Sequence, residues 1–275
     1  MAYLALMLSA GVPGARAQQA APVGLDPSVA REGTALLVAA DESMLRANGR
    51  SADSVAIALP RGMRYDGAAR ERLCGRDQAA RSACPAASAI GFGRFIVAVR
   101  GYLFGDGQTE VMWSIDAYLG KRLRRGDAAS VVLISNLLGA GNVGTLLEPV
   151  LGTSVPRTAT TVGRLVRASG AYGFEVRLSK LPVQLEVAAP VTATPARLEL
   201  ALSAVRRIRQ NFTRRIRVRT LSGYEGRTIH DHRLVGHHLL RTPESCHASW
   251  PSRLTVGFRG GLRRIASPIA CEPPR

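Results

Sequence analysis

The fold of this chain is constrained most by a succession of short apolar or alternating stretches, each closed off by glycine, proline, aspartate or serine. Stretches of about 4–8 residues between turn-forming residues are typical of β-strands, whereas amphipathic helices need longer windows with a period of about 3.6 residues. In one of them Leu198, Leu200 and Leu202 share a face. The expected strands are 34–39, 54–59, 91–99, 110–119, 130–138, 162–167, 173–178, 184–187, 197–205, 214–220, 230–240, 253–258 and 262–266.

Signals for helices are few. Residues 43–50 and 67–84 can form short helical turns, and a third candidate at 143–151 is interrupted by Pro149. Many short strands separated by turns, with few helices, predict an all-β fold of the antiparallel β-sandwich type. A division of the β-region into two sandwich-like halves near residues 140–160 stays open.

The N-terminus has the pattern of a secretory signal peptide. A short apolar stretch ends at Pro13 and Gly14, and Ala15-Arg16-Ala17 supplies a small-x-small cleavage site. The alternative, an ordinary N-terminal helix, is disfavoured because an Ala/Pro/Gln-rich spacer follows. We therefore expect a signal peptide at 1–17, a flexible leader at 18–32 and a β-region at 33–275. No later stretch reaches the roughly 18 apolar residues of a transmembrane helix, which predicts a secreted or envelope-associated protein.

Four cysteines fit an oxidising compartment. No C-x-x-C pair indicates zinc or redox chemistry. Four cysteines allow three pairings, and local pairing of Cys74 with Cys84 and of Cys246 with Cys271 is favoured because each bridge closes a short loop around turn-forming residues. Each bridge would contribute about 3 kcal/mol by restricting the unfolded chain.

The formal net charge of +17 indicates an anionic partner. Lys121 and Lys180 are the only lysines among 37 basic residues, so part of the arginine excess can reflect a GC-rich coding sequence. A surface this basic attracts phosphate-rich polymers or acidic glycans, with an affinity that falls as salt rises. Specific nucleic-acid recognition is not expected, because aromatic residues for base stacking make up 5% of the chain.

The arginines are densest between residues 206 and 219. Alternation places Arg215, Arg217 and Arg219 on one face of a strand, which predicts a binding stripe for a polyanion. The alternative is a solvated edge strand whose charges discourage aggregation. The candidate polyanion-binding residues are Arg206, Arg207, Arg209, Arg214, Arg215, Arg217 and Arg219.

The histidines cluster between residues 230 and 247. On a strand His230 and His232 point to the same side, which leaves open a zinc or copper site completed by His237, His238 or Glu244. The alternative is a set of polar positions on a solvent-facing hairpin. A metal-dependent envelope enzyme built on His230, His232 and His237 is accordingly the alternative function.

Gly139, Gly141 and Gly144 have the G-x-G-x-x-G spacing of a dinucleotide-binding loop. Such a loop needs a strand before the first glycine, a helix from the third, and an acidic residue about 20 positions further on. Here Pro149 limits the helix and the acid at the required position is missing. We therefore predict no nucleotide and no other cofactor.

Catalytic motifs are equally scarce. The sequence contains no G-x-S-x-G elbow and no paired carboxylates set apart by their neighbours. We therefore predict an exported non-enzymatic β-sandwich protein, a structural or binding module for an anionic polymer at or near the cell envelope.

Two segments carry a recognisable pattern: SVAIALPRGMRYDGAARERLC with ACPAASAIGFG, and PESCHASWPSRLTVGFRGG with ASPIAC. They resemble uncharacterised exported β-rich proteins of high-GC actinobacteria. The resemblance covers about half of the chain and implies a secreted β-rich domain with two local disulfides, without implying an activity. The matching positions are Leu59, Pro60, Gly62, Cys74, Cys84, Pro85, Ser88, Gly91, Cys246, Trp250, Gly260, Gly261 and Cys271.

Overall fold

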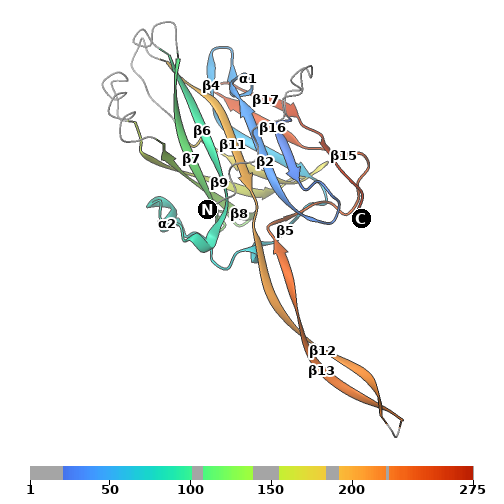
Figure 1. The fold of residues 1–275 in the computed structure, drawn as a ribbon. Helices are drawn as coiled ribbons and strands as arrows, with labels where there is room; N and C mark the ends of the chain where they lie inside the picture. The colour runs from blue at the N-terminus through green and yellow to red at the C-terminus, as the bar shows by residue number, and fades with distance from the viewer. Residues whose placement is uncertain (1–20, 101–107, 139–154, 184–191, 221–222, 275) are drawn as a thin grey trace, which may run out of the picture.

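The computed structural model describes residues 21–100, 108–138, 155–183, 192–220 and 223–274, and parts of 208–234 by their backbone alone. Within these ranges the chain is mostly antiparallel β-structure with two short α-helices, so the predicted all-β fold is confirmed (Figure 1). None of the helices in these ranges is long and apolar enough to cross a bilayer. The predicted signal peptide at 1–17, the predicted strand at 184–187 and the glycines of 139–144 lie outside the described residues.

The helical elements are α1 Glu42–Leu45, α2 Arg76–Ala80, and the 3-10 turns η1 Gly67–Ala69 and η2 Ala86–Ser88. The strands are β1 Val23–Asp26, β2 Gly33–Asp41, β3 Arg46–Ala47, β4 Arg50–Pro60, β5 Arg64–Tyr65, β6 Ala89–Arg100, β7 Gln108–Gly120, β8 Asp127–Leu137, β9 Thr158–Arg167, β10 Tyr172–Leu178, β11 Thr192–Leu202, β12 Val205–Thr220, β13 Gly223–His238, β14 Leu240–Arg241, β15 Ser249–Trp250, β16 Arg253–Phe258, β17 Gly261–Ala266 and β18 Ile269–Ala270.

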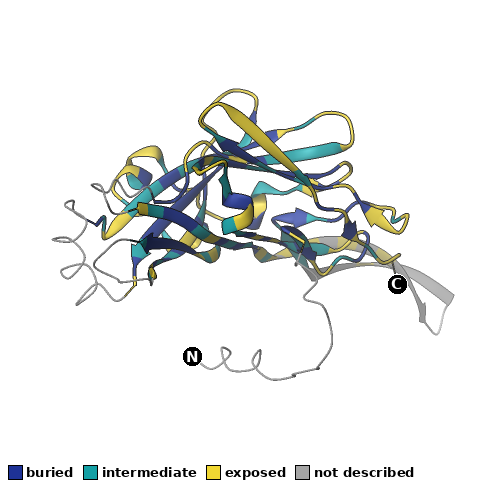
Figure 2. Cartoon of the chain, turned by 90° about the horizontal axis from the view of Figure 1, so that it is seen from above, coloured by how far each residue is buried: buried dark blue, intermediate teal, exposed yellow. Residues whose placement is uncertain are grey.

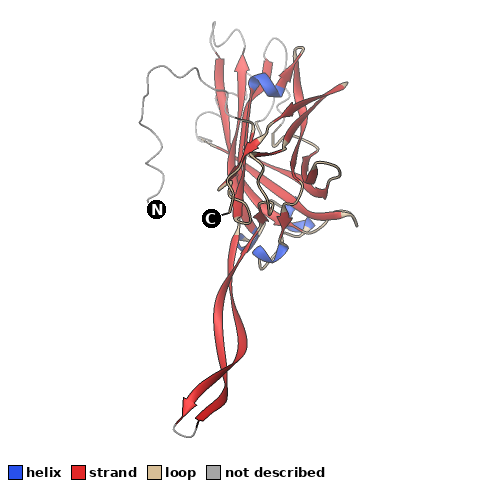
Figure 3. Cartoon of the chain, turned by 90° about the vertical axis from the view of Figure 1, so that its right-hand side faces the viewer, coloured by secondary structure: helices blue, strands red, loops and turns tan. Residues whose placement is uncertain are grey.

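Most strands belong to one sheet with the order β17-β16-β4-β10-β9-β8-β7-β6-β11-β2-β14-β5, to which β1 and β3 are added. The sheet curls, so that β6, β7, β11 and β2 lie across the core from β9, β10, β4 and β16 (Figures 1 and 3). Strands β8 and β9, which flank residues 140–160, pair with each other from Asp127 and Val166 to Asn136 and Thr158. The strands on either side of that segment are therefore neighbours in the same sheet.

A single large core fills the space between the two layers (Figure 2). The face predicted for β11 is the inner one, because Leu198, Leu200 and Leu202 are all buried. At the centre Trp113 is fully buried and donates its Nε1–H to the carbonyl of Pro156 at 3.0 Å. The alternation of the sequence therefore decides which side of each strand faces the core.

Part of the expected flexible leader is a strand instead. Residues Val23–Asp26 form β1, which pairs with β2, and Val23 and Leu25 are buried. The Val23 N–H donates to the Ser267 hydroxyl at 3.1 Å, which ties this strand to the other end of the chain. Val23 and Leu25 form a short alternating pattern typical of an edge strand. The surrounding alanines and prolines made this pattern hard to recognise in the sequence.

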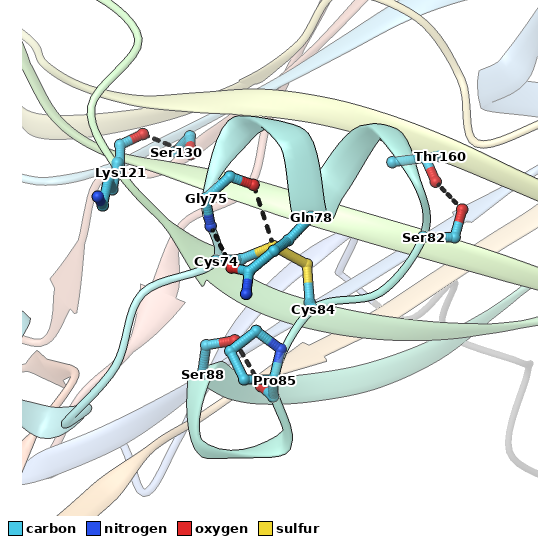
Figure 4. Close-up of a disulfide and its surroundings, with 10 residues drawn as sticks. All are labelled: Cys74, Gly75, Gln78, Ser82, Cys84, Pro85, Ser88, Lys121, Ser130 and Thr160. Carbon is cyan, nitrogen blue, oxygen red and sulfur yellow. Dashed lines mark hydrogen bonds between the residues drawn. A yellow bond between two sulfur atoms is a disulfide. The ribbon is translucent and has the colours of Figure 1, made fainter.

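Both disulfides join cysteines that are close in sequence, Cys74 with Cys84 and Cys246 with Cys271. The first closes a loop around α2 (Figure 4). The backbone of Cys74 is itself bonded to the end of β7, where its N–H donates to Leu119 at 2.8 Å. Cys74 also packs with Ala79, Val132 and Ile134 in a small second core on the outer face of β8. The disulfide loop therefore covers a strand that is apolar on both faces.

Gly91 allows β6 and β11 to approach closely, and we expect Gly91→Ala to destabilise the protein. A Cβ at this position would lie 1.9 Å from the carbonyl oxygen of Ala201, so the backbone of β11 would have to move. Overpacking of this kind costs about 1–3 kcal/mol of unfolding free energy, measurable by urea denaturation. Gly261→Ala is the matched control, because a Cβ there meets no atom within 4 Å. Equal stability of the two variants would contradict the prediction.

Candidate functional site

Strands β12 and β13 form a long hairpin that projects from one end of the curled sheet as a twisted ribbon (Figures 1 and 3). Each strand has 16 residues, which at a rise of about 3.3 Å per residue gives a length of about 50 Å. The pairing is unbroken from Val205 and His238 at the base to Thr220 and Gly223 near the tip. We call residues 205–238 the arm, and the other described residues the body.

The register divides the arm into two faces of different chemistry. Residues two apart on a strand share a face, and residues directly opposite each other share it too. One face, which we call the cationic face, carries Arg207, Arg209, Arg215, Arg217 and Arg219, together with His230 and His232. The opposite face carries most of the apolar residues, both acidic residues and the other four arginines: Ile208, Phe212, Ile216, Val218, Ile229, Val235, Glu225, Asp231, Arg206, Arg214, Arg227 and Arg233.

The charges of the arm are therefore segregated. Five arginines and no carboxylate give the cationic face a charge of +5, whereas four arginines and two acids give the other face +4 − 2 = +2. Successive arginines at 215, 217 and 219 are about 7 Å apart along the strand. This spacing is shorter than the Debye length of about 8 Å at physiological salt, so their potentials add.

The predicted polyanion-binding residues fall on both faces of the arm. Arg207, Arg209 and Arg215 have exposed side chains on the cationic face. Arg206 lies on the opposite face at the base, where its Nη2 is 3.9 Å from Glu71 of the body. Arg214 also lies on the opposite face by register. By register, five of the seven predicted arginines therefore share the cationic face and two lie on the opposite face.

The base of the arm is held by the core. Ala204 and Leu239, which precede and follow the hairpin, are both 4% exposed, and the Leu239 N–H donates to the Ala204 carbonyl at 2.8 Å. The Asp66 N–H donates to the Leu239 carbonyl at 3.0 Å. Arg241 donates to the carbonyl of Gly236 at 2.9 Å. These contacts attach the base of the arm to the body.

A histidine–carboxylate pair adds to this attachment. His237 Nδ1 lies 2.7 Å from Asp66 Oδ2. Burial raises the pKa of Asp66, but hydrogen bonds from His237 and from the Ala68 N–H outweigh burial and hold this pKa below its ordinary value. The adjacent His238 covers Gly33, where a Cβ would lie 1.9 Å from the imidazole Nδ1. Glycine at position 33 therefore leaves room for this ring.

The predicted metal ligands do not come together at one point of the arm. His230 and His232 lie opposite Thr213 and Asn211 on the cationic face. His237 lies on the opposite face by register, five residues or about 16 Å from His232 along the strand, and is paired with Asp66. Within the described residues there is no group of three or more histidine, cysteine, aspartate or glutamate side chains placed to hold a metal.

The other proposed third ligands are also engaged elsewhere. Glu244 pairs with Arg64 at the surface of the body, and His238 lies over Gly33. Strand β8, which precedes the glycine-rich segment, is antiparallel to both of its neighbours, β7 and β9. A dinucleotide-binding loop follows a strand of a parallel sheet, so the context of the glycines differs from the one their spacing requires.

The sequence predicted both strands of the arm in part, as 214–220 and 230–240, and missed how far they extend. The predicted strand began at residue 214, whereas β12 begins at Val205. The signal was present, because the apolar residues Ile208, Phe212 and Ile216 recur every four positions on one face of a continuous strand. Arg227 and Arg233 of β13 were not recognised as charges of the arm, because the histidines around them were interpreted as possible metal ligands.

Comparison of the chain with protein-family models, with curated proteins and with solved structures finds no match.

We expect acidification to destabilise the protein through His238 at the base of the arm. Burial, followed by the nearby charge of Arg241, lowers the pKa of His238 from its ordinary value of 6.5. As the pH falls through about 6.5, the unfolded chain binds this proton before the folded protein does, so the free energy of unfolding decreases. Urea denaturation at about pH 7.5 and about pH 5.5 measures the difference.

The variant His238→Gln should reduce this pH dependence, because it removes the titrating group. The exposed His247 provides the matched control His247→Gln. A pH dependence that is the same in His238→Gln as in the unaltered protein would contradict the prediction.

Proposed function

We propose that this protein is an exported, non-enzymatic β-protein at or near the cell envelope, and that its arm binds an anionic polymer such as a phosphate-rich polymer or an acidic glycan. The observation that carries the proposal is the register of the arm. It collects five arginines on one face and leaves both acidic residues of the arm on the other. Guanidinium groups bind phosphate, sulfate and carboxylate oxygens through paired hydrogen bonds, so such a face suits a repeating anion.

The shape of the arm favours a long ligand. A ribbon about 50 Å long presents its cations in a line, and a linear polymer can contact several of them at once. The contacts are exposed and each is weak, so the affinity comes from their number and falls as salt rises. A small anion would gain from only one or two of them.

Export is supported by the cysteines. All four are paired in two disulfides, and such bridges are typical of proteins that fold in oxidising compartments. An envelope location would bring the arm next to anionic polymers. The disulfides therefore support the proposed location, and the positive charge of the arm supports the proposed ligand.

Removal of three arginines from the cationic face should weaken binding to a polyanion. We expect the triple variant Arg215→Ala, Arg217→Ala and Arg219→Ala to elute from a heparin or phosphate matrix at clearly lower salt than the unaltered protein. The slope of the logarithm of affinity against the logarithm of salt concentration should become shallower by about 2–3, close to one for each anionic group that an arginine no longer neutralises.

The matched control removes the same charge from the body. Arg72, Arg76 and Arg81 are exposed residues in and just before the first disulfide loop. The triple variant Arg72→Ala, Arg76→Ala and Arg81→Ala has the same net charge as the arm variant. Elution of both triple variants at the same salt would show that only net charge matters, and would refute a specific role for the arm.

A further inference from the structure

The body contains a basic hollow that is separate from the arm. It has a volume of about 530 Å³, is open to solvent, and lies between β5, the β7–β8 turn, the end of β9 and the start of β10. Its lining includes Tyr65, Arg122, Arg125, Arg167 and Phe174. The rings of Tyr65 and Phe174 meet edge to face with their centres 6.3 Å apart, and form its apolar wall. This volume is in the range of ordinary ligand sites, about 300–1,000 Å³.

The one carboxylate in this lining is already neutralised. Asp127 accepts hydrogen bonds from Arg164 Nη2 at 2.5 Å and from Arg164 Nε at 3.0 Å, and from the Arg124 N–H at 3.0 Å. The hydrogen bonds from Arg164 are the main cause that holds the pKa of Asp127 below its ordinary value, so it stays ionised and engaged. Among the described residues no acidic side chain pairs with Arg122, Arg125 or Arg167. Three guanidinium groups therefore line one hollow without a counter-ion from the described chain.

A second basic hollow adjoins the first. It has a volume of about 330 Å³ and shares Arg167 with the first hollow. Its own acid, Glu175, is paired with Arg177 at 2.6 Å. Arg253 also lines it, with its guanidinium carbon 4.8 Å from the centre of the Tyr172 ring. The Nε of Arg253 is buried without a hydrogen-bond partner among the described residues.

Tyr65, which lines the first hollow, carries no charge. Burial, and secondarily the charge of Asp66, raises the pKa of Tyr65 to about 12, so its hydroxyl keeps its proton at any physiological pH. A neutral hydroxyl donates to an oxyanion, whereas a phenolate would repel it. The aromatic wall therefore does not oppose an anion in this hollow.

We propose that the two hollows form one binding site for a short chain of linked oxyanions, phosphate or sulfate, with Arg167 bridging two successive groups. Arg122 and Arg125 bind the group in the larger hollow, and Arg253 binds the group in the smaller one. Arginine is suited to this task because its planar group contacts two oxyanion oxygens at once. The site uses residues of the body alone, so it stands whether or not the arm binds a polymer.

Isothermal titration calorimetry of the full chain with tripolyphosphate tests the site. We expect tripolyphosphate to bind at least about tenfold more tightly than orthophosphate, because linked groups occupy both hollows. Arg167→Ala should weaken tripolyphosphate binding by about tenfold or more. Arg167→Lys, which keeps the charge but loses the paired hydrogen bonds, should give an intermediate affinity. Arg167 is exposed, and thermal unfolding of each variant checks that the fold is retained.

Two controls separate this site from the arm. Arg72→Ala removes an exposed charge elsewhere on the body and should leave the affinity unchanged. The arm variant Arg215→Ala, Arg217→Ala and Arg219→Ala should still bind tripolyphosphate, whether or not it has lost the longer polymer. A sulfated tetrasaccharide in place of tripolyphosphate distinguishes the source of the oxyanion, and tighter Arg167-dependent binding of either probe supports the site.

Three results would overturn the proposal. The first is equal affinity of Arg167→Ala and Arg72→Ala for both probes. The second is loss of tripolyphosphate binding in the arm variant with no effect of Arg167→Ala, which would assign the binding to the arm. The third is equal binding of orthophosphate and tripolyphosphate, which would leave a site for single ions.

Discussion

One apolar core, enclosed by a single curled sheet, is the feature on which both the arm and the hollows depend. A two-stranded ribbon is marginally stable in water, and like charges along one face weaken it further. Ala204 and Leu239 are joined to each other and packed in the core, each 4% exposed. Their burial gives the ribbon an anchor that its own pairing does not supply, so a highly charged arm can project from a stable body.

The body neutralises many of its acids internally. Asp127 is held by Arg164, Glu199 by Arg94 and Glu175 by Arg177. With 20 acidic residues against 37 basic ones, such pairing leaves cations in excess wherever no acid lies nearby. The cationic face of the arm and the hollow around Arg167 are two such places.

The strands could be predicted because a strand that is buried on one side has apolar residues at every second position, as at Leu198, Leu200 and Leu202. The same reasoning found that Arg215, Arg217 and Arg219 share a face. It could not show that β12 pairs only with β13 and leaves the body, because alternation does not reveal which strand lies alongside. The hollow around Arg167 could not be predicted from alternation either. Residues 65, 122 and 167 are far apart in the sequence and are brought together only by the order of strands in the sheet.

The arm and the hollows differ in how they meet an anion. Charges in water act over about one Debye length, roughly 8 Å, so the body attracts anions only close to its surface. An arm of about 50 Å carries cations several Debye lengths beyond that limit. It can therefore contact a polymer that the body does not yet touch. The hollows lie on the body and are open to solvent, so their exposed arginines attract an anion only at short range. On the two proposals together, a polymer would therefore meet the arm before it meets Arg167, and this order follows from the reach of the arm alone.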